Sequence, residues 1–103
     1  MKKVILFFAE GTEEVEALAS VDILRRAGAD VIVCGVGGEM RTGAHGITVK
    51  TDVTDADLSD GADFDMVVLP GGMPGTKYLG ASEKVRNFII RADRKSVGRE
   101  RVC

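Results

Sequence analysis

The chain has 103 residues, about one small domain, and 45% of them are hydrophobic, which is ordinary for a folded protein and too many for a disordered one. Its 14 Lys and Arg residues against 16 Asp and Glu residues give a net charge of −2, which argues against a nucleic-acid surface or an anionic-membrane surface. Two cysteines cannot build a disulfide scaffold, and the N-terminal apolar run is too short to cross a membrane, so we expect a cytoplasmic protein.

A buried strand and a helix are predicted at the start of the chain. Residues 4–8 are a continuous apolar run, which is typical of a strand covered by helices on both faces. Residues 11–14 predict a helix start, with Thr12 as the cap and glutamates at the positive end of the helix dipole. Gly28 is expected to end this helix in a left-handed conformation. Helical spacing predicts the buried face of the helix: Ala17, Leu18, Val21 and Leu24.

Two further apolar runs, residues 30–36 and 66–69, predict two more buried strands. Between them, residues 39–50 predict an exposed hairpin, and residues 56–58 predict a short helical turn. After the third strand a helical stretch begins at Gly75 and a second helix follows, with Ser82 as its cap. The buried face of that last helix is predicted to carry Val85, Phe88 and Ile89.

This alternation of strands and helices predicts an open α/β sheet, mostly parallel, with right-handed crossovers. In such sheets a ligand binds at the carboxyl ends of the strands, near the point where the strand order switches. Two loops meet this description, residues 9–16 and residues 70–76.

The pattern changes at residue 93. Residues 93–103 are polar and have almost no apolar periodicity, although an α/β sheet would continue with another buried strand. We therefore divide the chain into residues 1–92, the N-terminal part of one domain, and a tail, residues 93–103. Such a tail is expected in a fragment, or in a chain whose end is foreign to the original protein.

The loop Pro70-Gly71-Gly72 follows a buried strand and precedes a helix. Backbone N–H groups in such a loop can bind an anion or a developing oxyanion. The alternative is that the glycines only make a tight turn, and the spacing leaves both interpretations open. The loop is not a phosphate-binding loop of the P-loop type, because Gly71 and Gly75 are too close together.

Three glutamates open the first helix. Glu13 and Glu14 are expected to complement the helix dipole and to face water. Glu16 lies in the first full turn, where a partly buried carboxyl facing the strand ends would have a raised pKa, stay protonated and donate a hydrogen bond to an anion. Elsewhere, Cys34 is expected to be a core residue. His45 is expected to lie on the surface, with no second type of ligand near it and no metal site.

Two segments carry a resemblance to a known family. AEGTEEVE at residues 9–16, followed by VDILRRAG at residues 21–28, resembles the start of the ThiJ/PfpI superfamily, and within it the protein deglycase (glyoxalase III) subgroup associated with Parkinson disease. DMVVLPGG at residues 65–72 is similar to the second signature of that family. The resemblance extends from about residue 3 to about residue 91, and the two motifs together, in this order, are fairly specific.

The resemblance implies a flavodoxin-like three-layer sandwich that forms a homodimer, with a reactive cysteine at a sharp strand-to-helix turn. Glu16 matches the acid that hydrogen-bonds the family's thiolate, and Gly72 matches the loop whose amides help form the oxyanion pocket. Cys103 falls near the expected cysteine when counted from Gly72. Its flanking residues are charged where the family has an apolar strand, and the family's downstream histidine is absent, so the role is not assigned to Cys103.

The resemblance further implies that the parent protein is a cysteine glyoxalase or deglycase, without metal or organic cofactor, acting on small reactive aldehydes such as methylglyoxal or on their adducts. The thiolate adds to the carbonyl, the Gly72 amide stabilises the oxyanion, and Glu16 handles a proton or tunes the thiol. Two alternatives stay open: a non-enzymatic redox-sensing or chaperone-like dimer, and a phosphate-binding flavodoxin-like module. The chain as given is expected to be nearly inactive, because the cysteine turn is missing.

Overall fold

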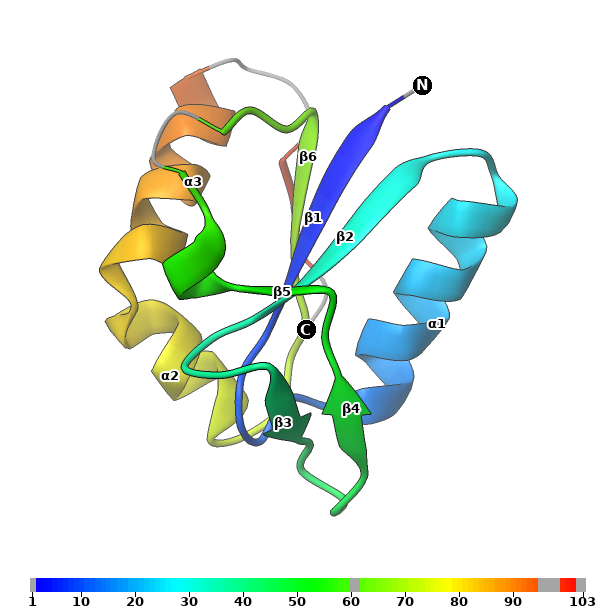
Figure 1. Ribbon diagram of the computed structural model, residues 1–103, viewed down its shortest axis with the longest axis vertical. Helices are drawn as coiled ribbons and strands as arrows, with labels where there is room; N and C mark the ends of the chain where they lie inside the picture. Colours follow the sequence, from blue (N-terminus) through cyan, green and yellow to red (C-terminus); the bar gives the residue numbers. More distant parts are fainter. Residues whose placement is uncertain (1, 60–61, 95–98, 102–103) are drawn as a thin grey trace.

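The computed structural model describes residues 2–59, 62–94 and 99–101, and its centre is a five-stranded sheet (Figure 1). The strands lie in the order β5-β2-β1-β6-β7, and all neighbours in this order pair in parallel. The predicted mostly parallel α/β sheet is therefore confirmed. The strand bounds are Lys3–Phe8 for β1, Asp30–Gly35 for β2, Val53–Thr54 for β5, Met66–Leu69 for β6 and Arg99–Arg101 for β7.

Helices cover both faces of this sheet, which gives the flavodoxin-like sandwich of three layers (Figure 1). Successive side chains of a strand point to opposite faces, so β1 supplies both cores. Its alternate residues pack toward α1 on one face and toward α2 and α3 on the other, where the rings of Phe7 and Phe88 lie 5.8 Å apart. No helix in the described part of the chain is long and apolar enough to cross a membrane. The helices are α1 (Glu14–Arg26), α2 (Gly75–Ala81) and α3 (Glu83–Arg94).

An antiparallel hairpin lies outside the main sheet, as predicted for residues 39–50 (Figure 1). It consists of β3 (Met40–Thr42) and β4 (Thr48–Lys50). The hairpin is tied to the loop after β1, because the Gly11 N–H donates to the Thr42 carbonyl at 2.9 Å. The predicted helical turn also forms, as a 3₁₀ turn over Asp55–Asp57.

The start of α1 differs from the prediction. Glu13, not Thr12, is the N-cap, and its carboxylate accepts the N–H groups of Val15 at 2.9 Å and Glu16 at 3.2 Å. The Thr12 hydroxyl is fully buried and accepts the Ala9 N–H at 3.0 Å instead. Because this hydroxyl is already engaged in the loop from β1, the helix begins later and is capped by a carboxylate, a stronger acceptor at the positive helix end.

The other helix predictions hold except for Leu18, and Leu24 and Ile89 are partly buried against the core. Gly28 adopts φ +94° just beyond α1, and Ala17 and Val21 are buried, as predicted. Leu18 was predicted to be buried as well but is 38% exposed, because it lies one position, about 100° of rotation, away from Ala17. Ser82 caps α3 as predicted, and its hydroxyl accepts an N–H three residues later at 3.3 Å.

The end of the described chain adds a strand within the predicted polar tail. β7 pairs with β6, and Arg99 lies opposite Val67. The residue pattern did not indicate this strand, since strand pairing uses backbone groups that every residue carries and residues 99–101 form no apolar run. The division of the chain at residue 93 stays a prediction, and Cys103 lies outside the described residues.

Candidate functional site

The sheet switches its strand order beside β1. The chain passes from β1 to β2 on one side, and β6 is then added on the other side of β1. Loops that leave the carboxyl ends of β1 and β6 therefore start next to each other, at the place where open α/β sheets bind ligands. These are the two loops that the sequence predicts, residues 9–16 and residues 70–76.

Glycines allow these two loops to pack backbone against backbone. The Glu13 N–H donates to the Gly71 carbonyl at 2.9 Å. Gly72 adopts φ +107°, and a Cβ on this residue would lie 2.5 Å from the Glu13 nitrogen. A Cβ on Gly75 would lie 2.6 Å from the Thr12 nitrogen. Glycine at these positions therefore fixes the start of α1 against the loop after β6.

Glu16 faces the Pro-Gly-Gly loop from the first turn of α1. One carboxyl oxygen, Oε1, accepts the Gly71 N–H at 3.3 Å, and the residue is partly buried. The next N–H along the loop, that of Gly72, has no acceptor among the described residues. A carboxyl group and an amide donor thus lie at the carboxyl end of β6. Their catalytic roles stay predictions.

Glu14 is buried, contrary to the prediction that it faces water. It is 1% exposed, and its carboxylate accepts the N–H groups of His45 at 2.9 Å and Ile47 at 3.0 Å. Burial by itself raises the pKa of this carboxyl, but the Ile47 and His45 hydrogen bonds outweigh burial and lower the pKa to about 2. The prediction was wrong because the donors belong to a hairpin that is distant in the sequence.

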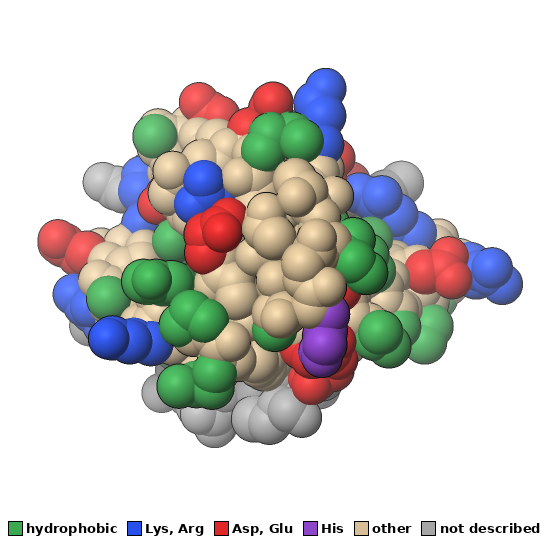
Figure 2. All heavy atoms as spheres, turned by 90° about the horizontal axis from the view of Figure 1, so that it is seen from below, with side chains coloured by type: hydrophobic (Ala, Val, Ile, Leu, Met, Phe, Trp, Pro, Cys, Tyr) green, Lys and Arg blue, Asp and Glu red, His purple; other side chains and the backbone are tan. Residues whose placement is uncertain are grey.

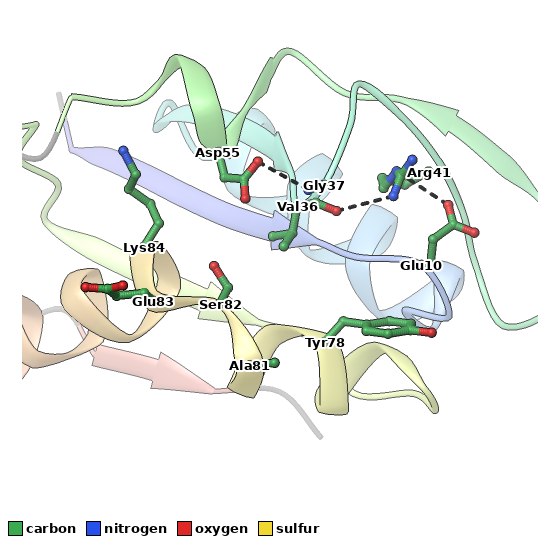
Figure 3. A pocket seen from close by; sticks show the side chains of 10 residues that line it. All are labelled: Glu10, Val36, Gly37, Arg41, Asp55, Tyr78, Ala81, Ser82, Glu83 and Lys84. Atoms are coloured by element: carbon green, nitrogen blue, oxygen red, sulfur yellow. Dashed lines mark hydrogen bonds and ion pairs between the residues drawn. The ribbon is translucent and has the colours of Figure 1, made fainter.

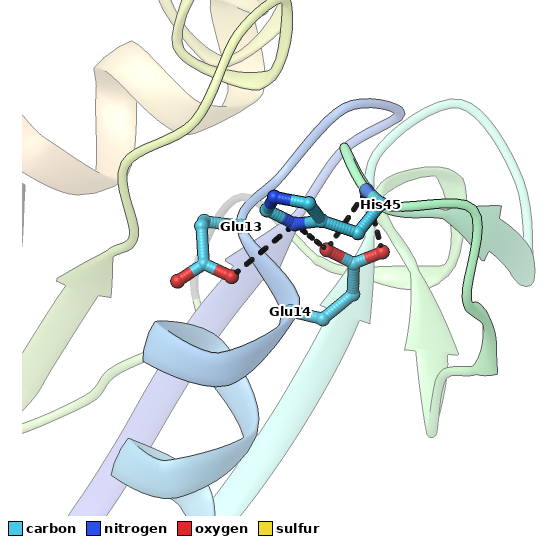
Figure 4. Close-up of side chains that lie close together, drawn as sticks. All are labelled: Glu13, Glu14 and His45. Atoms are coloured by element: carbon cyan, nitrogen blue, oxygen red, sulfur yellow. Dashed lines mark hydrogen bonds and ion pairs between the residues drawn. The ribbon is translucent and has the colours of Figure 1, made fainter.

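His45 is exposed, as predicted, but two carboxylates lie beside it, which was not predicted (Figure 4). Its Nδ1 is 3.1 Å from Oε1 of Glu14 and 3.6 Å from Oε1 of Glu13. Figure 2 shows the imidazole at the molecular surface, next to acidic side chains. The expectation that no second type of ligand lies near His45 is therefore wrong.

Cys34 is a core residue, as predicted. It is fully buried in β2, and burial, with a smaller contribution from Asp55 and Asp57, raises the pKa of its thiol to about 12. A thiol with this pKa carries almost no thiolate at neutral pH, and the thiolate is the nucleophilic form. Cys34 is therefore not a candidate nucleophile.

A pocket of about 480 Å³ lies near the carboxyl end of β2, beside the junction of α2 and α3 (Figure 3). Three of its charged side chains are engaged by the protein: Arg41 Nε lies 3.4 Å from Glu10 Oε1, and the Asp55 carboxylate accepts the Gly37 N–H at 3.2 Å. The residues that line this pocket do not include Glu16. No local pattern predicts the pocket, because its walls come from segments far apart in the chain.

Both the sequence and the fold have relatives among known proteins. The sequence matches the DJ-1/PfpI family over residues 2–98. It is 40% identical to Protein DJ-1 homolog A of Arabidopsis thaliana over 93 residues, which are 89% of this chain and 24% of that protein. It is 36% identical to a deglycase of Thermococcus kodakarensis over 70 residues, 68% of this chain and 42% of that protein.

The structure of oxidised Toxoplasma gondii DJ-1 has a similar fold, with a TM-score of 0.95. Its sequence is 29% identical, and the match covers 100% of this chain and 56% of that one. The chain spans less than two thirds of the length of each of these proteins. The family match includes both motifs, residues 9–16 and 65–72, and the two loops that meet at the switch point. The chain belongs to the DJ-1/PfpI family.

Proposed function

We propose that a complete DJ-1/PfpI domain containing this sequence is a cysteine-dependent glyoxalase or deglycase that acts on small reactive aldehydes such as methylglyoxal, or on the glycated groups they form. The observation that carries the proposal is the hydrogen bond from the Gly71 N–H to Glu16, which sets an acid against the Pro-Gly-Gly loop at the switch point. The similarity to the Thermococcus kodakarensis deglycase supports the substrate class.

Glu16 is proposed to stabilise the reactive thiolate. One of its oxygens already accepts the Gly71 N–H, which orients the carboxyl group. In its protonated form, the other oxygen donates a hydrogen bond toward the sulfur. A hydrogen bond to the charged form of a thiol lowers the pKa of that thiol and raises the fraction of thiolate at neutral pH.

The proposed first step is addition of the thiolate to the aldehyde carbonyl. A carbon–sulfur bond forms, the π electron pair moves onto oxygen, and the resulting alkoxide accepts the Gly72 N–H. Glu16 then transfers its proton to the alkoxide, which gives a neutral thiohemiacetal. This sequence of steps needs no metal and no organic cofactor, because the protein supplies the nucleophile, the amide donor and the proton.

The complete protein is further proposed to be a cytoplasmic homodimer. Apolar side chains on the outer face of α1 support a protein partner: Val15 is 70% exposed, Ile23 is 64% exposed and Leu18 is 38% exposed. Large apolar side chains that are exposed on one helix are typical of an interface between subunits. Light scattering of the complete protein, with Ile23→Glu as the disrupting variant, tests this assignment.

A second candidate, a redox-sensing dimer, has one observation in its favour. The similar Toxoplasma gondii DJ-1 structure is of an oxidised protein. A sensor needs the same thiolate but reacts with an oxidant in place of an aldehyde. Glu16 would therefore stabilise the thiolate beside the glycine loop in both functions. Turnover of methylglyoxal separates the two candidates.

The decisive experiment is lactate formation from methylglyoxal by the complete domain. We expect turnover, a decrease in kcat/KM of about 100-fold or more in Glu16→Leu, and a smaller decrease in Glu16→Gln, which keeps a donor. Glu83→Gln is the matched control, since Glu83 is an exposed acid in the first turn of another helix, α3. A complete domain that is rapidly oxidised by peroxide but forms no lactate would support the sensor and contradict the enzyme.

A further inference from the structure

We propose that Glu13, Glu14 and His45 form a binding site for a divalent transition-metal ion of the Zn²⁺ type. The donor atoms come from two segments of the chain, the start of α1 and the turn between β3 and β4 (Figure 4). Each residue offers one ligand atom, and these atoms all lie within 4.8 Å of one another. The proposed aldehyde chemistry uses none of these residues, so the two proposals stand or fall separately.

The separations between the donor atoms fit a coordination shell. Zinc lies about 2.1 Å from nitrogen and carboxylate ligands, so neighbouring donors of a tetrahedral site are roughly 3.4 Å apart. The two separations from His45 Nδ1, 3.1 Å to Glu14 Oε1 and 3.6 Å to Glu13 Oε1, lie on either side of that value. The Glu13 and Glu14 oxygens lie within 4.8 Å of each other, so side-chain rotation can bring all three atoms around one ion.

The imidazole can present the required lone pair. When its proton resides on Nε2, the Nδ1 atom is unprotonated and faces both carboxylates. The His45 side chain is 69% exposed, so the Nε2 proton can be shared with water. The same exposure leaves room for a water molecule as a fourth ligand.

Backbone groups hold both carboxylates in place before an ion arrives. Glu14 accepts the N–H groups of His45 and Ile47, and Glu13 accepts those of Val15 and Glu16. Each carboxylate oxygen has two lone pairs, so these hydrogen bonds and a metal bond can coexist. Such outer hydrogen bonds orient metal ligands and raise metal affinity.

The local electrostatics favour a cation despite the helix end. The N-terminus of α1 contributes roughly half a positive charge, whereas the two ionised carboxylates contribute two negative charges. Imidazole together with carboxylates suits Zn²⁺ and its transition-metal neighbours. Mg²⁺ prefers six oxygen ligands in a strict octahedron and is therefore expected to bind poorly.

The experiment uses the full chain without an affinity tag, in a Cys103→Ser background because a thiol is itself a strong zinc ligand. Zn²⁺ is titrated at neutral pH by calorimetry and by proton NMR, in which the single histidine gives an unambiguous ring signal. We expect 1:1 binding with a micromolar Kd and a shift of the His45 ring resonances. His45→Ala and Glu13→Gln should each weaken binding by about 10-fold or more, and Mg²⁺ should produce neither response.

Glu83→Gln is the control, because Glu83 is an exposed acid at the start of α3 and should leave the Kd unchanged. Glu14 is kept intact in all variants because of its burial, and His45→Gln replaces His45→Ala if the alanine variant loses its circular dichroism spectrum. Binding no tighter than millimolar overturns the proposal. Micromolar binding that leaves the His45 resonances unmoved, or that survives both variants, overturns it equally.

Discussion

The first turn of α1 carries two glutamates, Glu14 and Glu16, that point to opposite sides of the helix and have different surroundings. Glu14 points to the hairpin, where two backbone N–H groups and an imidazole surround it and it is 1% exposed. Glu16 is two residues further along, about 200° around the helix axis, and one N–H from the loop after β6 contacts it. The surroundings of each carboxylate, and not its place in the motif, therefore decide how many protein donors it binds and how far it is buried.

The largest effect is expected from Glu14→Leu. The substitution leaves the N–H groups of His45 and Ile47 buried without an acceptor, which is costly because water cannot replace the carboxylate. We expect the melting temperature of this chain to fall by something on the order of 10 °C. Calorimetry or circular dichroism measures it. A melting temperature equal to that of the wild-type chain would show that the hairpin side does not depend on Glu14.

The stabilising effect of Glu14 is also expected to depend on pH. Its pKa is lowered from 4.5 to about 2 in the folded chain, so the carboxyl binds its proton less readily when folded than when unfolded. The stabilisation is complete above the unfolded pKa and is lost as pH falls through the folded pKa. Urea unfolding between about pH 6 and pH 2 should therefore show a steeper loss of stability for the wild-type chain than for Glu14→Gln. Parallel pH profiles would contradict the assignment.

Gly72 lies where the loop after β6 packs against the start of α1, so a substitution there tests that packing. Gly72→Ala places a Cβ 2.5 Å from the Glu13 nitrogen at φ +107°, and we expect it to cost about 2 kcal/mol or more in unfolding free energy. Gly80→Ala is the control, because nothing lies within 4 Å of its Cβ and α2 favours alanine over glycine. Equal stabilities of the two variants would mean that the loops are not packed as described.

The smallest effect is expected from Glu16→Gln in this chain. Glu16 accepts one N–H in a partly buried position, and glutamine retains an acceptor oxygen, so the unfolding free energy should change by less than about 1 kcal/mol. Denaturant unfolding measures the change. A loss as large as that from Glu14→Leu would assign Glu16 a structural role and remove the contrast between the two glutamates.

Much of this fold follows from local patterns in the sequence. The apolar runs at residues 4–8, 30–36 and 66–69 predicted β1, β2 and β6, and Gly28 and Ser82 marked helix ends correctly. These features depend on residues that are close together in the chain, so the sequence alone predicts them. Strand β7 was not predicted because backbone pairing with β6, and not an apolar run, defines it.

The candidate site was predictable only in part. The two loops at the switch point follow from strand order and turn residues. Glu16, whose carboxyl is predicted to face the strand ends, accepts the Gly71 N–H there. The burial of Glu14 and the grouping with His45 were missed. Both depend on the hairpin folding back onto α1, a contact between residues 31 positions apart that no local spacing records.

The central claim, that Glu16 is the functional acid, is tested most directly by the pKa of the reactive cysteine in a complete family domain containing this sequence. Thiolate absorbance against pH is measured for the wild type, Glu16→Leu, Glu16→Gln and Glu13→Gln. We expect Glu16→Leu to raise the cysteine pKa most, with each unit equivalent to about 1.4 kcal/mol, Glu16→Gln to raise it less, and Glu13→Gln to leave it unchanged. Equal shifts in all three variants would reveal a general field effect and contradict the role assigned to Glu16.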